Sequence, residues 1–220
     1  MRWLKPGTGY GGAVRHAPWW GVASSAAAPV LMVAGWTTAA GLQPSFDPVA
    51  DTVSALAAPG AADRWVMTAT FVVVGACYFV TGLGLRPARL PGRLLLMAAA
   101  VTGVLVAFNP EHPGTTLPVP HMIWGAAGCA VLVAWPVGAW RRGPAVPWGL
   151  RPAVSAAVVA VLLALLAWFA TELITGGGQA GLAERVFGTA QALWPLTVVL
   201  SCCYAARTAA RPSAQPVATA

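Results

Sequence analysis

Carboxylates and a histidine are the residues of this sequence that could transfer protons. The chain has six Asp and Glu residues among 220, and three of them lie in the polar stretch 43–64, between two apolar segments. Asp51 in that stretch and Glu172 near the end of a later apolar segment could act as acids, and His121 as an acid or a base. An ionisable group at membrane depth is by default a candidate for function. We therefore predict Asp51, His121 and Glu172 as catalytic residues.

Aromatic and polar residues at helical spacing could line such a site. Trp168 precedes Glu172 by four residues and Gln191 precedes Trp194 by three, so each pair shares one face of a helix. An indole face stabilises a cation, and a carboxylic acid kept neutral by burial can donate a proton. These properties suit acid-initiated chemistry on an isoprenoid or other lipid substrate, for which we predict the substrate-binding residues Trp36, Ser54, Trp124, Trp168, Arg185, Gln191 and Trp194.

Local signals also give the aspartates of the stretch 43–64 a structural role. Asp47 followed by Pro48 is typical of a helix start, and Pro-Gly twelve residues later is typical of a stop. We expect a short extracytoplasmic helix over residues 48–57, with Asp51 and Ser54 on one face. That face turns either toward the other helices or into water.

Structural alternatives apply to the other candidates as well. His121 could hydrogen-bond a loop carbonyl instead of acting as an acid or base. Glu172 could cap the GGGQAG turn that follows it, and Arg185 could pair with Glu172 or with an aspartate of the stretch 43–64. Tryptophans near the ends of membrane helices are usually interfacial anchors.

No motif in the sequence indicates a metal, a cofactor or nucleic acid. Glu111, His112 and His121 lie in and after a proline-rich loop, but neither HxxxH nor HExxH spacing occurs. The net charge of +7 is scattered singly over loops, which favours anionic lipid headgroups as partners over nucleic acid. The sequence carries no signal for an oligomeric state. Four cysteines lie in apolar segments without metal or CxxC spacing, and we predict that they are buried thiols: Cys77, Cys129, Cys202 and Cys203.

Composition places these residues in a membrane. Apolar residues make up 58% of the chain, charged residues 9%, and the mean hydropathy is +0.69. This is more apolar surface than one soluble core buries. Because about 20 apolar residues span a bilayer as a helix, we predict an all-α bundle of six spans in the cell membrane: residues 19–42, 65–85, 94–108, 121–140, 152–174 and 186–206.

The cations predict how these spans are oriented. With six spans, eleven Lys and Arg residues fall in the two termini and in the loops on the same side, which the positive-inside rule makes cytoplasmic. All six acids then lie on or near the outer side. We predict a cytoplasmic N-terminal segment (residues 1–18), one transmembrane domain (19–206) and a disordered cytoplasmic tail (207–220).

Three motifs resemble a known family. DTVSALAAPG (51–60) follows the first span, FNPEHPG (108–114) is followed by His121 at the start of the fourth, and GLAERVFGTAQALW (181–194) opens the sixth. Together they are similar to domain-of-unknown-function family 998, six-span bacterial membrane proteins, over nearly the whole chain. The resemblance implies shared structural or site positions but no activity: Asp51, Ser54, Pro110, His121, Glu184 and Arg185.

Two functions remain as hypotheses. The first is a membrane-embedded enzyme, similar to small integral-membrane terpene cyclases, that acts on an isoprenoid or lipid substrate by acid-initiated chemistry. The second is a non-catalytic membrane protein: a bundle that stabilises or senses the envelope, or a small transporter. No half-to-half repeat of the kind common in transporters is visible.

Overall fold

Six long helices make up most of the described chain. A computed structural model describes residues 17–111 and 119–210. Each long helix is long and apolar enough to cross a membrane, which confirms the prediction of an all-α, multi-pass membrane protein. The elements are α1 (Trp19–Gly41), η1 (Ser54–Ala57), α2 (Trp65–Gly84), α3 (Leu90–Phe108), α4 (Val119–Ala139), η2 (Trp148–Leu150), α5 (Pro152–Thr175) and α6 (Ala180–Ala209), where η marks a short 3₁₀ helix.

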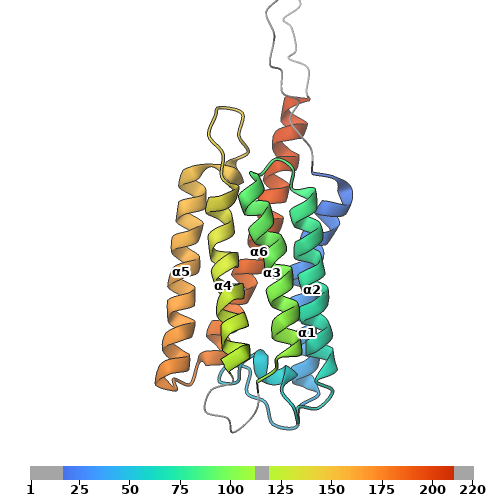
Figure 1. Cartoon of the computed structure of the whole chain (residues 1–220), viewed down its shortest axis with the longest axis vertical. Coiled ribbons are helices and arrows are strands. Elements are labelled where there is room, and N and C mark those ends of the chain that lie inside the picture. Colours follow the sequence, from blue (N-terminus) through green and yellow to red (C-terminus); the bar gives the residue numbers. More distant parts are fainter. Residues whose placement is uncertain (1–16, 112–118, 211–220) are drawn as a thin grey trace, which may run out of the picture.

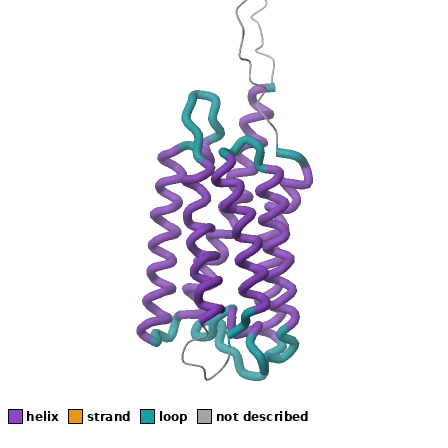
Figure 2. Tube along the Cα trace, in the orientation of Figure 1, coloured by secondary structure: helices purple, strands orange, loops and turns teal. Residues whose placement is uncertain are grey.

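The long helices stand side by side and run alternately up and down (Figure 1). Each of α1 to α5 packs against the next helix in the chain, and α6 returns to pack against both α1 and α5. Helix α5 lies at the edge, and a much smaller share of its apolar stretch is buried in the bundle than in α6. Figure 2 shows that loops are confined to the two ends of the bundle.

Close contacts through glycine hold neighbouring helices together. A side chain at Gly92 in the first turn of α3 would collide with the backbone of Ala139 at the end of α4. The Arg89 amide, just before α3, donates to the Ala139 carbonyl at 3.2 Å. Because membrane helices associate through such close packing of small residues, α3 and α4 are held rigidly at this end.

The carboxylate side chains all lie at one end of the bundle. One end, here called the acid end, holds all six carboxylate side chains of the chain with Arg64 and Arg185. The opposite end, the basic end, holds seven arginines in the described residues and no carboxylate side chain: Arg86, Arg89, Arg93, Arg141, Arg142, Arg151 and Arg207. Which end faces the cytoplasm stays a prediction.

Several predicted helix ends need correction. Helix α3 begins at Leu90 instead of residue 94, because Pro91 fits the first helical turn, and α4 begins at Val119 instead of residue 121. Helix α6 begins six residues before the predicted residue 186 and continues to Ala209, inside the predicted tail. The rest of both predicted terminal segments lies largely outside the described residues.

The predicted helix over residues 48–57 is wrong. One helical turn forms after Asp47, with the Asp51 amide donating to the Asp47 carbonyl at 2.7 Å. The chain then breaks and only η1 is helical. The break occurs because the carbonyls of residues 48–51 bind partners on α6 instead of continuing a helix.

Candidate functional site

The loop that follows α1 closes the acid end by inserting apolar side chains between the helices. Val53 and Leu56 are 3% and 1% exposed and pack with Trp36 of α1 and Met67 of α2. Burying a side chain of this size stabilises a fold by roughly 1.5–3 kcal/mol. The loop therefore acts as a fixed plug.

Glu184 in the second turn of α6 holds this plug in place. Its carboxylate accepts hydrogen bonds from the Val53 amide at 2.6 Å and from the Ser54 hydroxyl at 3.3 Å. Glu184 also lies within electrostatic reach of Glu111 and of Cys129. A partly buried carboxylate is thus joined to a loop about 130 residues away in sequence.

Arg185 binds the same loop through backbone oxygens. Its Nη1 donates to the carbonyls of Pro48, Asp51 and Gly181 at 2.8, 2.9 and 2.9 Å, and its Cζ lies 5.4 Å from the ring centre of Phe46. The predicted ion pair of Arg185 with Glu172 or an aspartate does not form among the described residues. Backbone carbonyls, instead of a carboxylate, accept the hydrogen bonds of the Arg185 guanidinium group.

The first amides of α6 complete the attachment. The amides of Gly181 and Leu182 donate to the carbonyls of Ala50 and Val49 at 3.2 and 2.9 Å. A side chain at Gly181 would collide with the Asp51 carbonyl. These bonds satisfy amides that a helix start leaves free, which explains why α6 begins before its apolar stretch. We call the contacts of Glu184, Arg185, Gly181 and Leu182 with residues 48–54 the clasp.

Asp51 and Glu172, two predicted catalytic acids, accept hydrogen bonds from backbone amides. The Asp51 carboxylate accepts a hydrogen bond from the Asp47 amide at 2.9 Å. Glu172 Oε2 accepts one from the Gln179 amide at 3.0 Å and so caps the turn between α5 and α6. The structure therefore does not join these two acids in one pocket.

His121 lies at the start of α4 and is 8% exposed. Its Nδ1 is 2.9 Å from the Asn109 carbonyl oxygen, and its Nε2 is 3.7 Å from Glu111 Oε1. Because a carbonyl only accepts, Nδ1 carries a hydrogen. At 3.7 Å the contact with Glu111 is longer than a hydrogen bond, so the structure shows a hydrogen bond of His121 with Asn109 and a looser electrostatic contact with Glu111. Residues 112–118, which include His112, lie outside the described residues.

A partly open cavity of about 140 Å³ lies between the helices, farther from the acid end than these groups. Its wall is mostly apolar and is formed by five helices. The residues that line it are Met32 of α1; Phe71, Val74, Gly75 and Tyr78 of α2; Ala99, Thr102, Gly103 and Val106 of α3; Gly125, Gly128, Cys129 and Leu132 of α4; and Gly188 and Gln191 of α6.

One polar side chain in the cavity wall has a buried donor without a partner among the described residues. Gln191 is 6% exposed, and its Nε2 makes no hydrogen bond. An unsatisfied buried polar group costs roughly 1–3 kcal/mol. Gln191 therefore carries an unused hydrogen-bond donor in a residue that lines the cavity.

Helical spacing connects the cavity with the charged groups at the acid end. On α6, Glu184 precedes Gly188 by four residues and Gln191 by seven, so the three share one face. On α4, His121 precedes Gly125 and Gly128 by the same intervals. Glu184 and His121 thus stand one turn beyond the cavity, toward the acid end, with Glu111 beside both.

None of the four predicted substrate-binding tryptophans lines this cavity. Trp36 packs under η1, and Trp194 makes an edge contact with Trp148 of η2, at a ring separation of 6.2 Å, toward the basic end. Trp124 and Trp168 are partly exposed on α4 and α5. Of the predicted binding residues, Gln191 lines the cavity, and Ser54 and Arg185 belong to the clasp.

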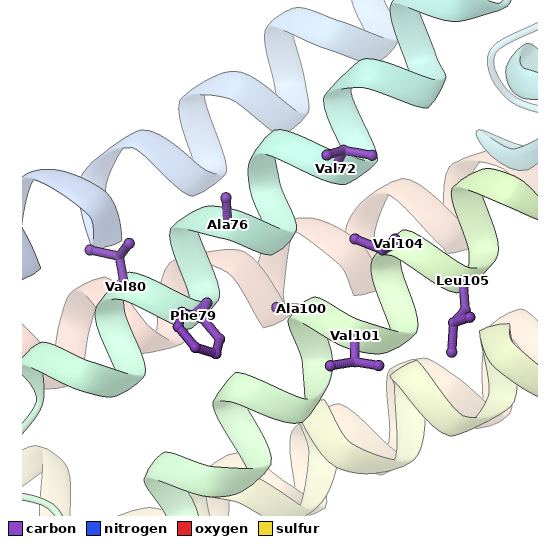
Figure 3. Close-up of a pocket in the computed structure, with 8 residues that line it drawn as sticks. All are labelled: Val72, Ala76, Phe79, Val80, Ala100, Val101, Val104 and Leu105. Atoms are coloured by element: carbon purple, nitrogen blue, oxygen red, sulfur yellow. The ribbon is translucent and has the colours of Figure 1, made fainter.

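A second hollow, of about 450 Å³, opens on the outer surface between α2 and α3 (Figure 3). Its eight lining side chains are apolar, among them Phe79, Val101 and Leu105. No polar group in it orients a ligand, so the hollow fits ordinary lipid chains. In the described part of the chain, no three His, Cys, Asp or Glu residues are grouped to hold a metal ion.

The catalytic and substrate-binding residues predicted from the sequence did not include Glu111 or Tyr78, and Glu184 was named among the positions that the family resemblance implies. The spacing of Glu184, Gly188 and Gln191 was visible in the sequence. Which face of α6 turns inward was not, because α6 is buried on several sides.

Comparison with known proteins gives one result for the whole bundle. Residues 26–201 match the family described as protein of unknown function (DUF998). No curated protein and no solved structure matches the chain.

Proposed function

The chain belongs to the DUF998 family, and we propose that it is a membrane-embedded binding protein for a small, mainly apolar molecule with one hydrogen-bond acceptor. The observation that carries the proposal is the unpartnered Gln191 amide in the wall of the cavity. Space left between side chains and an amide without a hydrogen-bond partner both lower the stability of a bundle. A ligand removes both costs at once.

The size of the cavity limits the ligand. A volume of about 140 Å³ equals roughly four to five water molecules at about 30 Å³ each. The cavity fits a ring or a short prenyl or acyl segment. A carbonyl or hydroxyl oxygen of the same ligand would accept a hydrogen bond from Gln191 Nε2. Sites that enclose a whole drug-sized molecule hold about 300–1,000 Å³. The binding role therefore has better support than cyclisation of a long isoprenoid chain.

Substitution of Gln191 by Leu tests the binding role. The variant removes the unsatisfied amide, so we expect the ligand-free protein to become more stable, by roughly 1–3 kcal/mol. The thermal stabilisation that farnesol, farnesyl acetate or a short-chain prenyl quinone gives the native protein in nanodiscs should disappear. A glutamine needed for structure would destabilise the protein when replaced, which contradicts the proposal.

Filling the cavity provides an independent check. A Cβ at Gly125 has open space, and one at Gly188 meets its nearest neighbour, Trp36, at 4.0 Å. The double variant Gly125→Leu, Gly188→Leu should therefore fold and should lose binding. The matched control is Ala164→Leu on the exposed side of α5, which should bind as the native protein does. Binding by the filled variant, or no binding of any probe by the native protein, would refute a ligand in this cavity.

Acid-initiated chemistry on an isoprenoid or lipid is the second candidate. The proximity of His121 to Glu111, with Glu184 one helical turn from Gly188 toward the acid end, is the observation that favours it. In that mechanism these groups would supply the starting proton, since Asp51 and Glu172 are hydrogen-bonded to backbone amides of their own loops.

Product analysis separates the two candidates. Membranes with native protein would be incubated with a panel of prenylated compounds and the products identified by mass spectrometry. An enzyme should lose turnover in Glu111→Gln and His121→Asn but keep it in Asp51→Asn and Glu172→Gln. If the native protein converts none of the panel, the enzymatic candidate has no support and the binding role stands alone.

A further inference from the structure

A third pocket, at the basic end of the bundle, is lined with arginine. Its volume is about 570 Å³, and it is formed by Arg89, just before α3, by Trp140, Arg141 and Arg142, just after α4, and by Val146. We refer to it as the basic pocket. It lies far from the Gln191 cavity, at the opposite end of the bundle from the clasp.

The three guanidinium groups of the basic pocket have no anionic partner in the protein. Nothing in residues 17–111 and 119–210 accepts a hydrogen bond from the side chain of Arg89, Arg141 or Arg142, and Arg142 contacts only the ring of Trp140, at 5.9 Å. All six carboxylate side chains of the chain lie at the acid end. A helix of 20 residues is about 30 Å long, so no carboxylate side chain reaches the pocket.

The backbone that carries these arginines is rigid. The Arg89 amide binds the Ala139 carbonyl at 3.2 Å, and the Arg141 amide binds the Leu150 carbonyl at 2.8 Å. Beneath the pocket, Gly92 and Gly138 bring the backbones of α3 and α4 together. The three arginines therefore line one pocket on a hydrogen-bonded backbone, and their exposed side chains leave the positive charge accessible to an anion from outside.

The level of the pocket along the bundle identifies that anion. It lies where helices α3 and α4 meet the end of the membrane-spanning region, the level at which phospholipid headgroups lie. Trp140 has the amphipathic ring that concentrates at this interface. Guanidinium groups bind phosphate through paired hydrogen bonds. We propose that the basic pocket is a specific binding site for the phosphate headgroup of an anionic phospholipid.

Lipid retention tests this proposal. The full chain would be purified in nanodiscs of phosphatidylcholine with or without one fifth phosphatidylglycerol, and retained lipid would be counted by native mass spectrometry. The double variant Arg141→Gln, Arg142→Gln should bind phosphatidylglycerol roughly thirty-fold more weakly, the effect of two cations near a headgroup. Unfolding of the variant in phosphatidylcholine alone should match that of the native protein.

The matched control is Arg86→Gln, Arg207→Gln, which removes the same charge from exposed sites at the same end but outside the pocket. It should retain the lipid. Arg141→Lys, Arg142→Lys keeps the charge but lacks the planar guanidinium group, and this double variant should bind the lipid with intermediate affinity.

Equal lipid loss in the two double variants with glutamine would mean an unspecific basic surface. Displacement of the lipid by millimolar inorganic phosphate would mean a free-anion site. Either result overturns the proposal.

Discussion

The two ends of the bundle use charged residues in opposite ways. At the acid end, charged side chains bind the backbone: Glu184 binds an amide of the plug, Arg185 binds three carbonyls, and Glu172 caps its own turn. At the basic end, Arg93 and Arg151 also bind carbonyls, but the three arginines of the basic pocket bind no described group.

This difference separates charges that build the fold from charges that remain available to a partner. A hydrogen bond to a charged group inside the protein contributes to folding, whereas an unpaired guanidinium at the surface contributes little. Substitutions at the acid end should therefore change stability, and substitutions in the basic pocket should change binding. The following predictions test that separation in order of decreasing effect on stability.

Replacement of Arg185 by Met should have the largest effect. It leaves the carbonyls of Pro48, Asp51 and Gly181 without their donor, and we expect a loss of roughly 3 kcal/mol or more in the free energy of unfolding. Equilibrium unfolding in mixed micelles measures this loss. Arg64→Met, an exposed arginine at the same end, serves as the control and should stay within about 0.5 kcal/mol of the native protein.

Replacement of Glu184 should have an intermediate effect that depends on the new side chain. Ala removes the acceptor of the Val53 amide and the Ser54 hydroxyl and should cost roughly 2 kcal/mol. Gln keeps one carbonyl oxygen in reach and should cost roughly half as much. Proteolysis of the loop around residues 53–58 should rise in the same order, Ala above Gln above native. If neither Ala nor Gln lowered the stability, the carboxylate would not hold the plug.

Replacement of Arg141 and Arg142 by Gln should have the smallest effect on unfolding. No described group loses a hydrogen bond, so in uncharged lipid we expect a change below about 0.5 kcal/mol. The same measurement with phosphatidylglycerol present should reveal a deficit, because the native protein is stabilised by the lipid that it binds. A large loss in uncharged lipid would instead place these arginines among the residues that build the fold.

The sequence predicted the fold well because the membrane imposes simple rules. Long apolar stretches are readable as spans, and all six are helices in the structure. The errors lie where polar residues extend a helix or interrupt one. Helix α6 starts at Ala180 because carbonyls of the loop after α1 accept hydrogen bonds from its first amides. The sequence does not reveal such a bond, because any residue type can supply a backbone carbonyl.

The candidate site was harder to predict for the same reason. Gln191 and His121 stood out as polar residues in apolar surroundings, but nothing local to Arg185 indicated that it would bind carbonyls instead of a carboxylate. Asp51 and Glu172 looked like free acids, yet each satisfies a nearby amide. The sequence does not show which tryptophans lie together. Trp36 packs toward the acid end, whereas Trp194 packs toward the basic end.

The clasp also dictates an order of events during synthesis. Residues 48–54 leave the ribosome early, whereas Gly181, Glu184 and Arg185 belong to the last membrane helix. Until that helix has been made and inserted, Val53 and Leu56 can pack on α1 and α2, but the backbone groups of residues 48–53 lack their partners on α6. A chain that stops after α5 would therefore keep the apolar contacts of the plug and lose the clasp.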